Sequence, residues 1–79
     1  MIKVLFFGPI AEHVAAREMC LEFDPGMCLQ DIVTRMQERY AEAFDIVSFI
    51  AVNQIQVRDK QLLLCDNDEV AFMAKFSGG

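Results

Sequence analysis

A chain of 79 residues is long enough for one small domain, and its 54% hydrophobic composition can supply a core. Twelve acidic against seven basic residues give a net charge of −5, which argues against nucleic acid and anionic membranes as partners. No apolar run approaches the roughly 20 residues that span a bilayer, and the first residues lack the layout of a signal peptide, so we expect a cytoplasmic protein.

The first third of the chain predicts two strands joined through a short helix. Ile2 to Phe7 is a run of β-branched and aromatic residues that stops at Gly8-Pro9, which is typical of a buried strand before a turn. The alanine-rich segment 10–17 favours one or two helical turns after the proline. Residues 19–23 then alternate between apolar and polar side chains, which predicts the second strand.

The apolar spacing changes to three and four from Leu29 to about Ala43, which predicts the main helix. Its apolar positions are expected to face the core: Leu29, Ile32, Val33, Met36 and Tyr40. Asp31 suits the positive end of the helix dipole, but no serine or threonine stands where a cap is expected. The start of the helix is therefore expected only to within a residue or two.

The next segment predicts a small hairpin followed by a charged turn. Residues 46–52 form a β-branched and aromatic run, and Asn53-Gln54 breaks it before the short segment 55–57. The three consecutive leucines at 62–64 fit either a 3₁₀ turn or a strand.

The last predicted strand is Glu69 to Lys75, with Val70 and Phe72 on one face and Ala71 and Met73 on the other. The order of elements fits one mixed sheet with a helix across one face, in which the first and last strands lie side by side and parallel. This is the α+β arrangement called β-grasp, or ubiquitin-like. We expect such a domain over residues 1–75 and a flexible diglycine tail over residues 76–79.

The titratable and nucleophilic residues predict no catalytic or metal centre. Cys20, Cys28 and Cys65 are odd in number and lack metal-ligand spacing, so we expect small buried hydrophobes in a reducing compartment. His13 has no other ligand at suitable spacing. There is also no glycine-rich phosphate loop and no pairing of nucleophile with base, so we expect neither an autonomous enzyme nor a stably bound cofactor.

The terminal residues Phe76-Ser77-Gly78-Gly79 carry the candidate reactive group, which is the carboxylate of Gly79. Glycine leaves the carbonyl carbon unshielded and reaches backbone angles barred to other residues, so Ser77 and Gly78 could thread a narrow slot. The four residues span about 13 Å when extended. The alternative is a frayed end, because small residues accumulate at disordered termini.

Four segments, in order and at matching spacing, resemble the small subunits of molybdopterin synthases, a family of sulfur carriers: Val4 to Phe7, Ala51 to Gln54, Asp66 to Phe72, and Ser77 to Gly79. The likeness spans nearly the whole chain. The thiamine-biosynthesis sulfur carrier shares the fold and the ending but is less similar at the first strand. Members often carry paired prolines where this chain has Ala74-Lys75, so the exit segment is expected to be less stiff and more positive.

The resemblance implies a chemistry for the terminus. An α-carboxyl group with a pKa of about 3.5 is ionised at neutral pH and is a poor acylating agent. An adenylating (E1-like) enzyme with ATP and magnesium would convert Gly79 to an acyl-adenylate, and a sulfur donor system would displace AMP to leave a thiocarboxylate. The synthase large subunit, which holds the active site, would then receive the tail and pass sulfur to cyclic pyranopterin monophosphate during molybdenum cofactor synthesis. A heterotetramer of two small and two large subunits is the implied assembly.

Four residues are predicted to bind partners: Phe7, Leu62, Lys75 and Phe76. Phe7 ends the first strand and Phe76 lies at the base of the tail, and apolar anchors of this kind dominate interface energies. A place in the core is an equal alternative for Leu62. Lys75 either positions the tail or sits in solvent.

Three other functions fit the same residues. The carried sulfur could serve thiamine, another metabolite or a tRNA. The chain could instead be a ubiquitin-like modifier joined through Gly79 to lysines of other proteins, or a passive binding module that does not use its diglycine.

Overall fold

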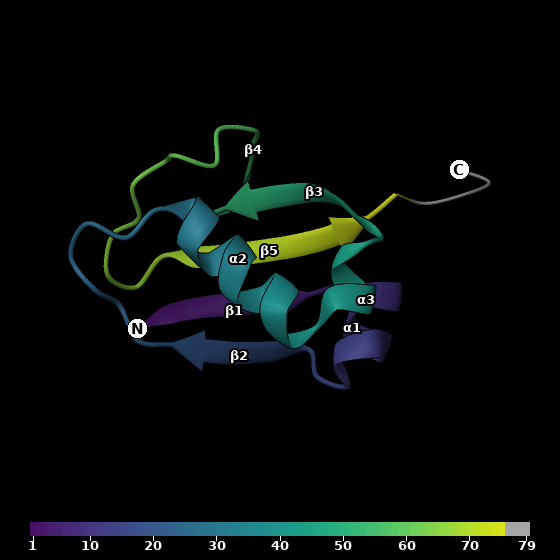
Figure 1. The fold of residues 1–79 in the computed structure, drawn as a ribbon. Helices are drawn as coiled ribbons and strands as arrows, with labels where there is room; N and C mark the ends of the chain where they lie inside the picture. Colours follow the sequence, from purple (N-terminus) through teal and green to yellow (C-terminus); the bar gives the residue numbers. More distant parts are fainter. Residues whose placement is uncertain (76–79) are drawn as a thin grey trace.

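The computed structural model describes residues 1–75, in which helices lie on one face of a mixed five-stranded sheet (Figure 1). In chain order the elements are β1 (Ile2–Phe6), α1 (Pro9–Val14), β2 (Glu18–Leu21), α2 (Leu29–Arg39), α3 (Ala41–Phe44), β3 (Val47–Val52), β4 (Ile55–Val57) and β5 (Glu69–Ala74). The strand order is β2-β1-β5-β3-β4. Only β1 and β5 pair in parallel, at the centre of the described sheet, so the predicted β-grasp arrangement is confirmed.

The core lies between the helices and the face of the sheet that they cover. Period-two alternation sends every second residue of each central strand to this face, and the three-and-four spacing of α2 supplies the opposite wall. The largest side chains below 2% exposure are those of Phe72, Ile2, Ile10, Leu29, Ile32, Met36, Val4 and Val70. Four of the five predicted apolar positions of the main helix are buried, and Tyr40 is half-buried against the same cluster.

The main helix is shorter than its apolar spacing predicts. It ends at Arg39, because Tyr40 leaves the helical region with φ −135° and ψ 56°, and a separate turn, α3, follows. The Tyr40 N–H still donates to the Met36 carbonyl at 2.7 Å, so the last turn of α2 is closed. After the change in direction, the centroid of the Phe44 ring lies 4.8 Å from that of the Phe72 ring, edge to face. The spacing of apolar residues along a continuous helix does not predict this contact.

The start of α2 is stabilised by a carboxylate instead of a hydroxyl. The Asp31 side chain accepts the backbone N–H of Cys28 at 2.8 Å, which is the reciprocal half of a capping box. An acidic residue in the first turn also suits the helix dipole. The helix begins at Leu29 as expected.

The predicted hairpin between β3 and β4 is confirmed. Asn53 and Gln54 both have positive φ, 51° and 70°, as a two-residue type I′ turn requires. Val52 faces Ile55, and Ile50 faces Val57.

Other boundaries shift by a few residues, each for a visible reason. The short helix ends at Val14 because Ala15 adopts the left-handed conformation, with φ 62°. Strand β2 ends at Leu21 because its partner β1 begins at Ile2, directly opposite. The leucine segment is neither a full strand nor a helix: Leu63 makes an isolated bridge to Cys28.

The prediction that the cysteines are buried is wrong. Cys20 and Cys65 are exposed and Cys28 is partly exposed. Cys20 faces Lys3 across the β1–β2 pair and so lies on the side of the sheet that the helices leave uncovered. Residue type alone set the expectation, whereas the alternation of β2 decides which side each residue takes.

Candidate functional site

The candidate site is the edge of the sheet where β1 and β5 end together. Because the two strands are parallel and Phe6 faces Phe72, their carboxyl ends lie at the same edge (Figure 1). The Phe7 N–H donates to the Phe72 carbonyl at 3.2 Å, and Phe7 is 46% exposed. Lys75, the last described residue, is exposed just beyond β5. The structure therefore brings two predicted partner-binding residues, Phe7 and Lys75, to one edge.

Strand β5 is held by a neighbouring strand on each side and by the core packed against one of its faces. It lies between β1 and β3, and Val70 and Phe72 are fully buried. The Phe72 ring contacts two other rings, Phe6 at 6.2 Å in a stacked arrangement and Phe44 at 4.8 Å edge to face. A buried phenylalanine of this kind contributes about 3–5 kcal/mol to stability. The end of β5 is thus a well-anchored point from which residues 76–79 continue.

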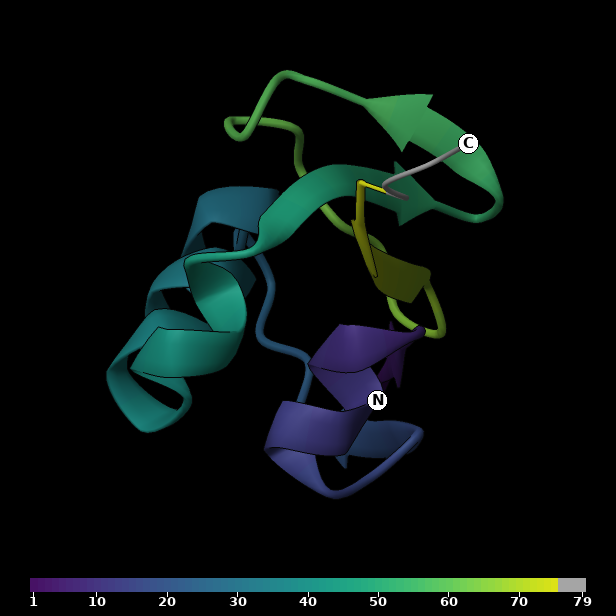
Figure 2. The same ribbon diagram turned by 90° about the vertical axis from the view of Figure 1, so that its right-hand side faces the viewer.

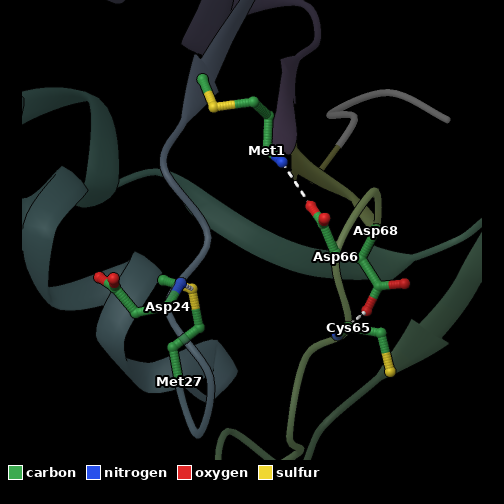
Figure 3. A network of polar contacts seen from close by, with 6 residues as sticks. All are labelled: Met1, Asp24, Met27, Cys65, Asp66 and Asp68. Carbon is green, nitrogen blue, oxygen red and sulfur yellow. Dashed lines mark hydrogen bonds and ion pairs between the residues drawn. The ribbon is translucent and has the colours of Figure 1, made fainter.

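The turn that leads into β5 is tied to the N-terminus. The Met1 ammonium group is paired with the Asp66 carboxylate (Figure 3). The Met1 carbonyl also accepts the Asn67 N–H at 3.0 Å. Within the turn, the Asp68 carboxylate accepts the Cys65 N–H at 2.7 Å. The hydrogen bond from the Met1 ammonium lowers the pKa of the exposed Asp66 carboxyl from its ordinary value. The start of β1 therefore holds the start of β5 in place.

The hairpin turn and the β5 turn are joined by side-chain hydrogen bonds. The Asn53 amide donates to the Asp68 carboxylate at 2.9 Å, and its carbonyl oxygen accepts the Glu69 N–H at 3.0 Å. The Asn53 N–H also donates to the Glu69 carbonyl at 2.8 Å. Two segments that carry the family resemblance, 51–54 and 66–72, thus form one structural unit, and the bonds explain why asparagine and aspartate stand there.

The face of the sheet opposite α2 and α3 carries an apolar surface across its three central strands. Figure 2 shows these two helices on one side of the sheet and, for the described residues, no helix on the other. Leu5 faces Ala71 across β1 and β5, Ala71 faces Ala51, and Met73 faces Phe49 across β5 and β3. We call these five residues the open-face patch. Phe49 is 38% exposed, and Leu5 and Met73 are partly exposed.

Sequence reasoning missed Leu5, Phe49 and Met73 as surface residues beside the exit of β5. The signal was the alternation in strands 2–7, 46–52 and 69–75, which puts each on the side away from its buried neighbours. Phe7 lies just beyond the patch at the end of β1, so the patch and Phe7 together flank the end of β5.

Leu62 lies elsewhere in the fold. Its carbonyl accepts the N–H of Leu29, the first residue of α2, at 2.9 Å, and its side chain is 36% exposed. The loop that contains it leads to the amino end of β5, whereas Phe7 and Lys75 lie at the carboxyl end. The structure does not bring Leu62 together with the other predicted partner-binding residues.

The remaining predicted site residues, Phe76, Ser77, Gly78 and Gly79, lie outside the described residues. Their assigned roles stay predictions. Within residues 1–75, no three histidine, cysteine, aspartate or glutamate side chains are grouped so that they could hold a metal ion. In the same range, no helix combines the length and apolar character needed to cross a membrane.

Comparison with known proteins gives matches over the whole length of the chain. The family model that matches is described as the ThiS family, and it covers residues 4–79. The molybdopterin synthase sulfur carrier subunit of Escherichia coli K12 is 37% identical over 82 aligned residues, which cover 100% of both chains.

Solved structures show the same fold. SAMP1 from Haloferax volcanii superimposes with a TM-score of 0.82 at 16% identity, covering 99% of this chain and 98% of that one. A putative molybdopterin converting factor subunit 1 from Pyrococcus furiosus gives 0.82 at 21% identity, covering 95% and 97%. The Helicobacter pylori complex of subunits 1 and 2 of molybdopterin-converting factor gives 0.73 at 22% identity, covering 99% and 97%. The β-grasp fold, the family match over residues 4–79 and the terminal diglycine agree, and the chain belongs to the ThiS family.

Proposed function

We propose that this protein is the sulfur carrier subunit of a molybdopterin synthase and donates sulfur during molybdenum cofactor synthesis. The observation that carries the proposal is the 37% identity to the Escherichia coli sulfur carrier subunit over the full length of both chains. The match covers 100% of both chains, which supports a role for the terminal Gly78-Gly79 of this chain in sulfur carriage. The firmly anchored β5 supports this role, because a tail of four residues can be presented reproducibly only from a fixed point.

The reactive group in this proposal is the carboxylate of Gly79. A separate adenylating enzyme activates it with ATP and magnesium, since a carboxylate ionised at neutral pH does not react with a sulfur nucleophile. A sulfur donor then displaces AMP and leaves a thiocarboxylate, which is the nucleophile that the large subunit uses. The domain itself contributes the surface that partners recognise and the fixed strand from which the tail continues. The catalytic groups belong to the partners.

The docking surface in this proposal is the open-face patch together with Phe7. It lies beside the end of β5, so a large subunit that covers it also receives the tail. Phe7 and Phe49 are large exposed apolar side chains on a chain with net charge −5, and such residues commonly anchor protein interfaces. The Helicobacter pylori complex, in which a protein of the same fold is bound to subunit 2, supports a heteromeric assembly.

Intact-mass measurement of the protein from its native cells tests the chemistry. A thiocarboxylate replaces one oxygen with sulfur and adds about 16 Da at the C-terminus. Branched glycine remnants on lysines of other proteins would instead identify a modifier. Copurification with a large synthase subunit would distinguish molybdenum cofactor synthesis from thiamine synthesis.

Gly79→Ala tests the need for an unhindered terminus. We expect the variant to lose most sulfur transfer in a reconstituted assay, because a methyl group at the reacting residue narrows the passage and shields the carbonyl carbon. Its melting temperature should match the wild type. A transfer rate equal to that of the wild type would refute the assigned role of Gly79.

A further inference from the structure

One edge of the sheet is left without a neighbouring strand over part of its length. Strand β4 pairs only with the second half of β3, and Ile50 facing Val57 is the pair farthest from the hairpin turn. Strand β3 begins three residues earlier, at Val47, and after Val57 the chain turns away toward α2. Among residues 1–75, no strand therefore lies along the β4 side of Val47 to Phe49.

The pairing of β3 with β5 is irregular at the same place. The register shifts between Val47 and Phe49, so Ser48 occupies a bulge. Bulges bend a strand and redirect its side chains, and they occur preferentially at sheet edges and near functional sites. The irregularity and the missing neighbour coincide on three consecutive residues.

A groove of about 440 Å³ lies beside this edge. Its apolar walls come from Val33 of α2, Phe44 of α3 and Val57 of β4. Gln37 and Gln56 also line the groove and supply neutral hydrogen-bonding groups. The groove therefore offers an apolar floor beside an unoccupied strand edge.

The charges of the groove are opposite to those of the whole chain. Arg58 and Lys60 line it, and no carboxylate does, although the chain has twelve acidic and seven basic residues. Three other hollows on residues 1–75 each contain at least one aspartate or glutamate. Within residues 1–75, neither Arg58 nor Lys60 forms an ion pair, and the intervening Asp59 carboxylate accepts the Gln61 N–H at 2.9 Å.

We propose that this groove binds an extended acidic segment of a partner protein, which adds to β3 as a short antiparallel strand in line with β4. Backbone groups of the segment would pair along Val47 to Phe49, an apolar side chain would enter between Val33 and Phe44, and carboxylates would meet Arg58 and Lys60. Strand addition of this kind takes affinity from main-chain hydrogen bonds and specificity from side-chain pockets. The groove shares only Phe49 with the open-face patch, so it is a second surface; because Val47 faces Ala74, it lies one strand away from the end of β5.

The test uses the full-length ¹⁵N-labelled protein and a capped synthetic peptide, acetyl-Glu-Asp-Val-Ile-Val-Asp-Glu-amide. We expect amide chemical-shift changes at residues 47–50 and 57–60, and slower hydrogen exchange for those N–H groups of residues 47–49 that point away from β5. The double variant Arg58→Ala/Lys60→Ala should bind the peptide about tenfold more weakly, because it loses two partly screened ion pairs. Arg35→Ala, which removes an exposed charge from α2 outside the groove, should leave the affinity unchanged.

Two control peptides sharpen the result. Replacing the four acidic residues by lysine should abolish binding, and replacing the central isoleucine by proline should weaken it, because proline cannot donate to a strand. Equal binding by the lysine peptide, or shift changes centred on Leu5 and Met73, would overturn the proposal. So would the same shift changes on raising the protein concentration without peptide, which would identify a second copy of the chain as the occupant.

Discussion

Replacing Asn53 tests how the hairpin turn holds the start of β5. Asn53 combines two roles: its backbone is left-handed, with φ 51°, and its side chain bonds both Asp68 and Glu69. Two substitutions separate these roles. Asn53→Gly removes the side-chain bonds but accepts the backbone conformation, whereas Asn53→Ala removes the bonds and also resists the conformation.

The expected magnitudes follow from the two roles. An exposed hydrogen bond contributes about 1 kcal/mol net, so loss of both should make Asn53→Gly about 2 kcal/mol less stable. Holding alanine in the left-handed region costs about 1 kcal/mol more, so Asn53→Ala should lose about 3 kcal/mol. For a domain of this size, with a total stability of roughly 4–12 kcal/mol, both losses are large.

Urea denaturation followed by far-ultraviolet circular dichroism is the suitable assay, because the chain has no tryptophan and one tyrosine. With a slope of about 1 kcal/mol per molar urea, the two variants should differ by about 1 M in midpoint. Equal midpoints for Asn53→Gly and Asn53→Ala would show that the left-handed conformation is not maintained. A midpoint for Asn53→Gly equal to that of the wild type would show that the side-chain bonds contribute nothing.

Three further predictions follow from the same structure. Gln54→Gly should raise the free energy of unfolding by about 0.5–1 kcal/mol, because Gln54 has φ 70° and makes no side-chain hydrogen bond within residues 1–75; an unchanged urea midpoint would contradict this. The lowered pKa of Asp66 means that its pairing with Met1 stabilises the fold above the ordinary carboxyl pKa of 3.8 and is lost as pH falls through the lower folded value. Asp66→Asn should therefore show a shallower fall of melting temperature below pH 4 than the wild type, and parallel curves would count against the pairing. Met73→Glu should weaken copurification of a large synthase subunit at least tenfold while the melting temperature stays within a few degrees, as measured beside the helix-surface variant Thr34→Glu; a large drop in melting temperature would mark Met73 as core.

Local patterns predicted most of the fold because each depends on neighbouring residues. The alternation at 69–75 gave the correct faces of β5, with Val70 and Phe72 inward, and Asn53-Gln54 gave the hairpin turn. The break at Tyr40 could not be predicted in this way, since the apolar spacing continues to Ala43 and the turn is stabilised by tertiary contacts such as that of Phe44 with Phe72. The predicted partner-binding residues differ in outcome for a similar reason. Phe7 lies beside the end of β5, as predicted, because parallel strands end together, whereas the position of Leu62 depends on where a long loop meets α2.

By itself the sequence determined the order of strands and helices, the parallel centre of the sheet and the family to which the chain belongs. Each of these features follows from short-range periodicity or from short segments that occur in a fixed order along the chain. Only the tertiary structure decided that Leu5, Phe49 and Met73 share one surface, that Asn53 bonds Asp68, and that Arg58 and Lys60 line a groove beside the part of β3 that β4 does not reach. Alternation assigns a residue to one side of its own strand, but which side the helices cover, and which distant strands lie next to it, depends on packing between segments far apart in the chain.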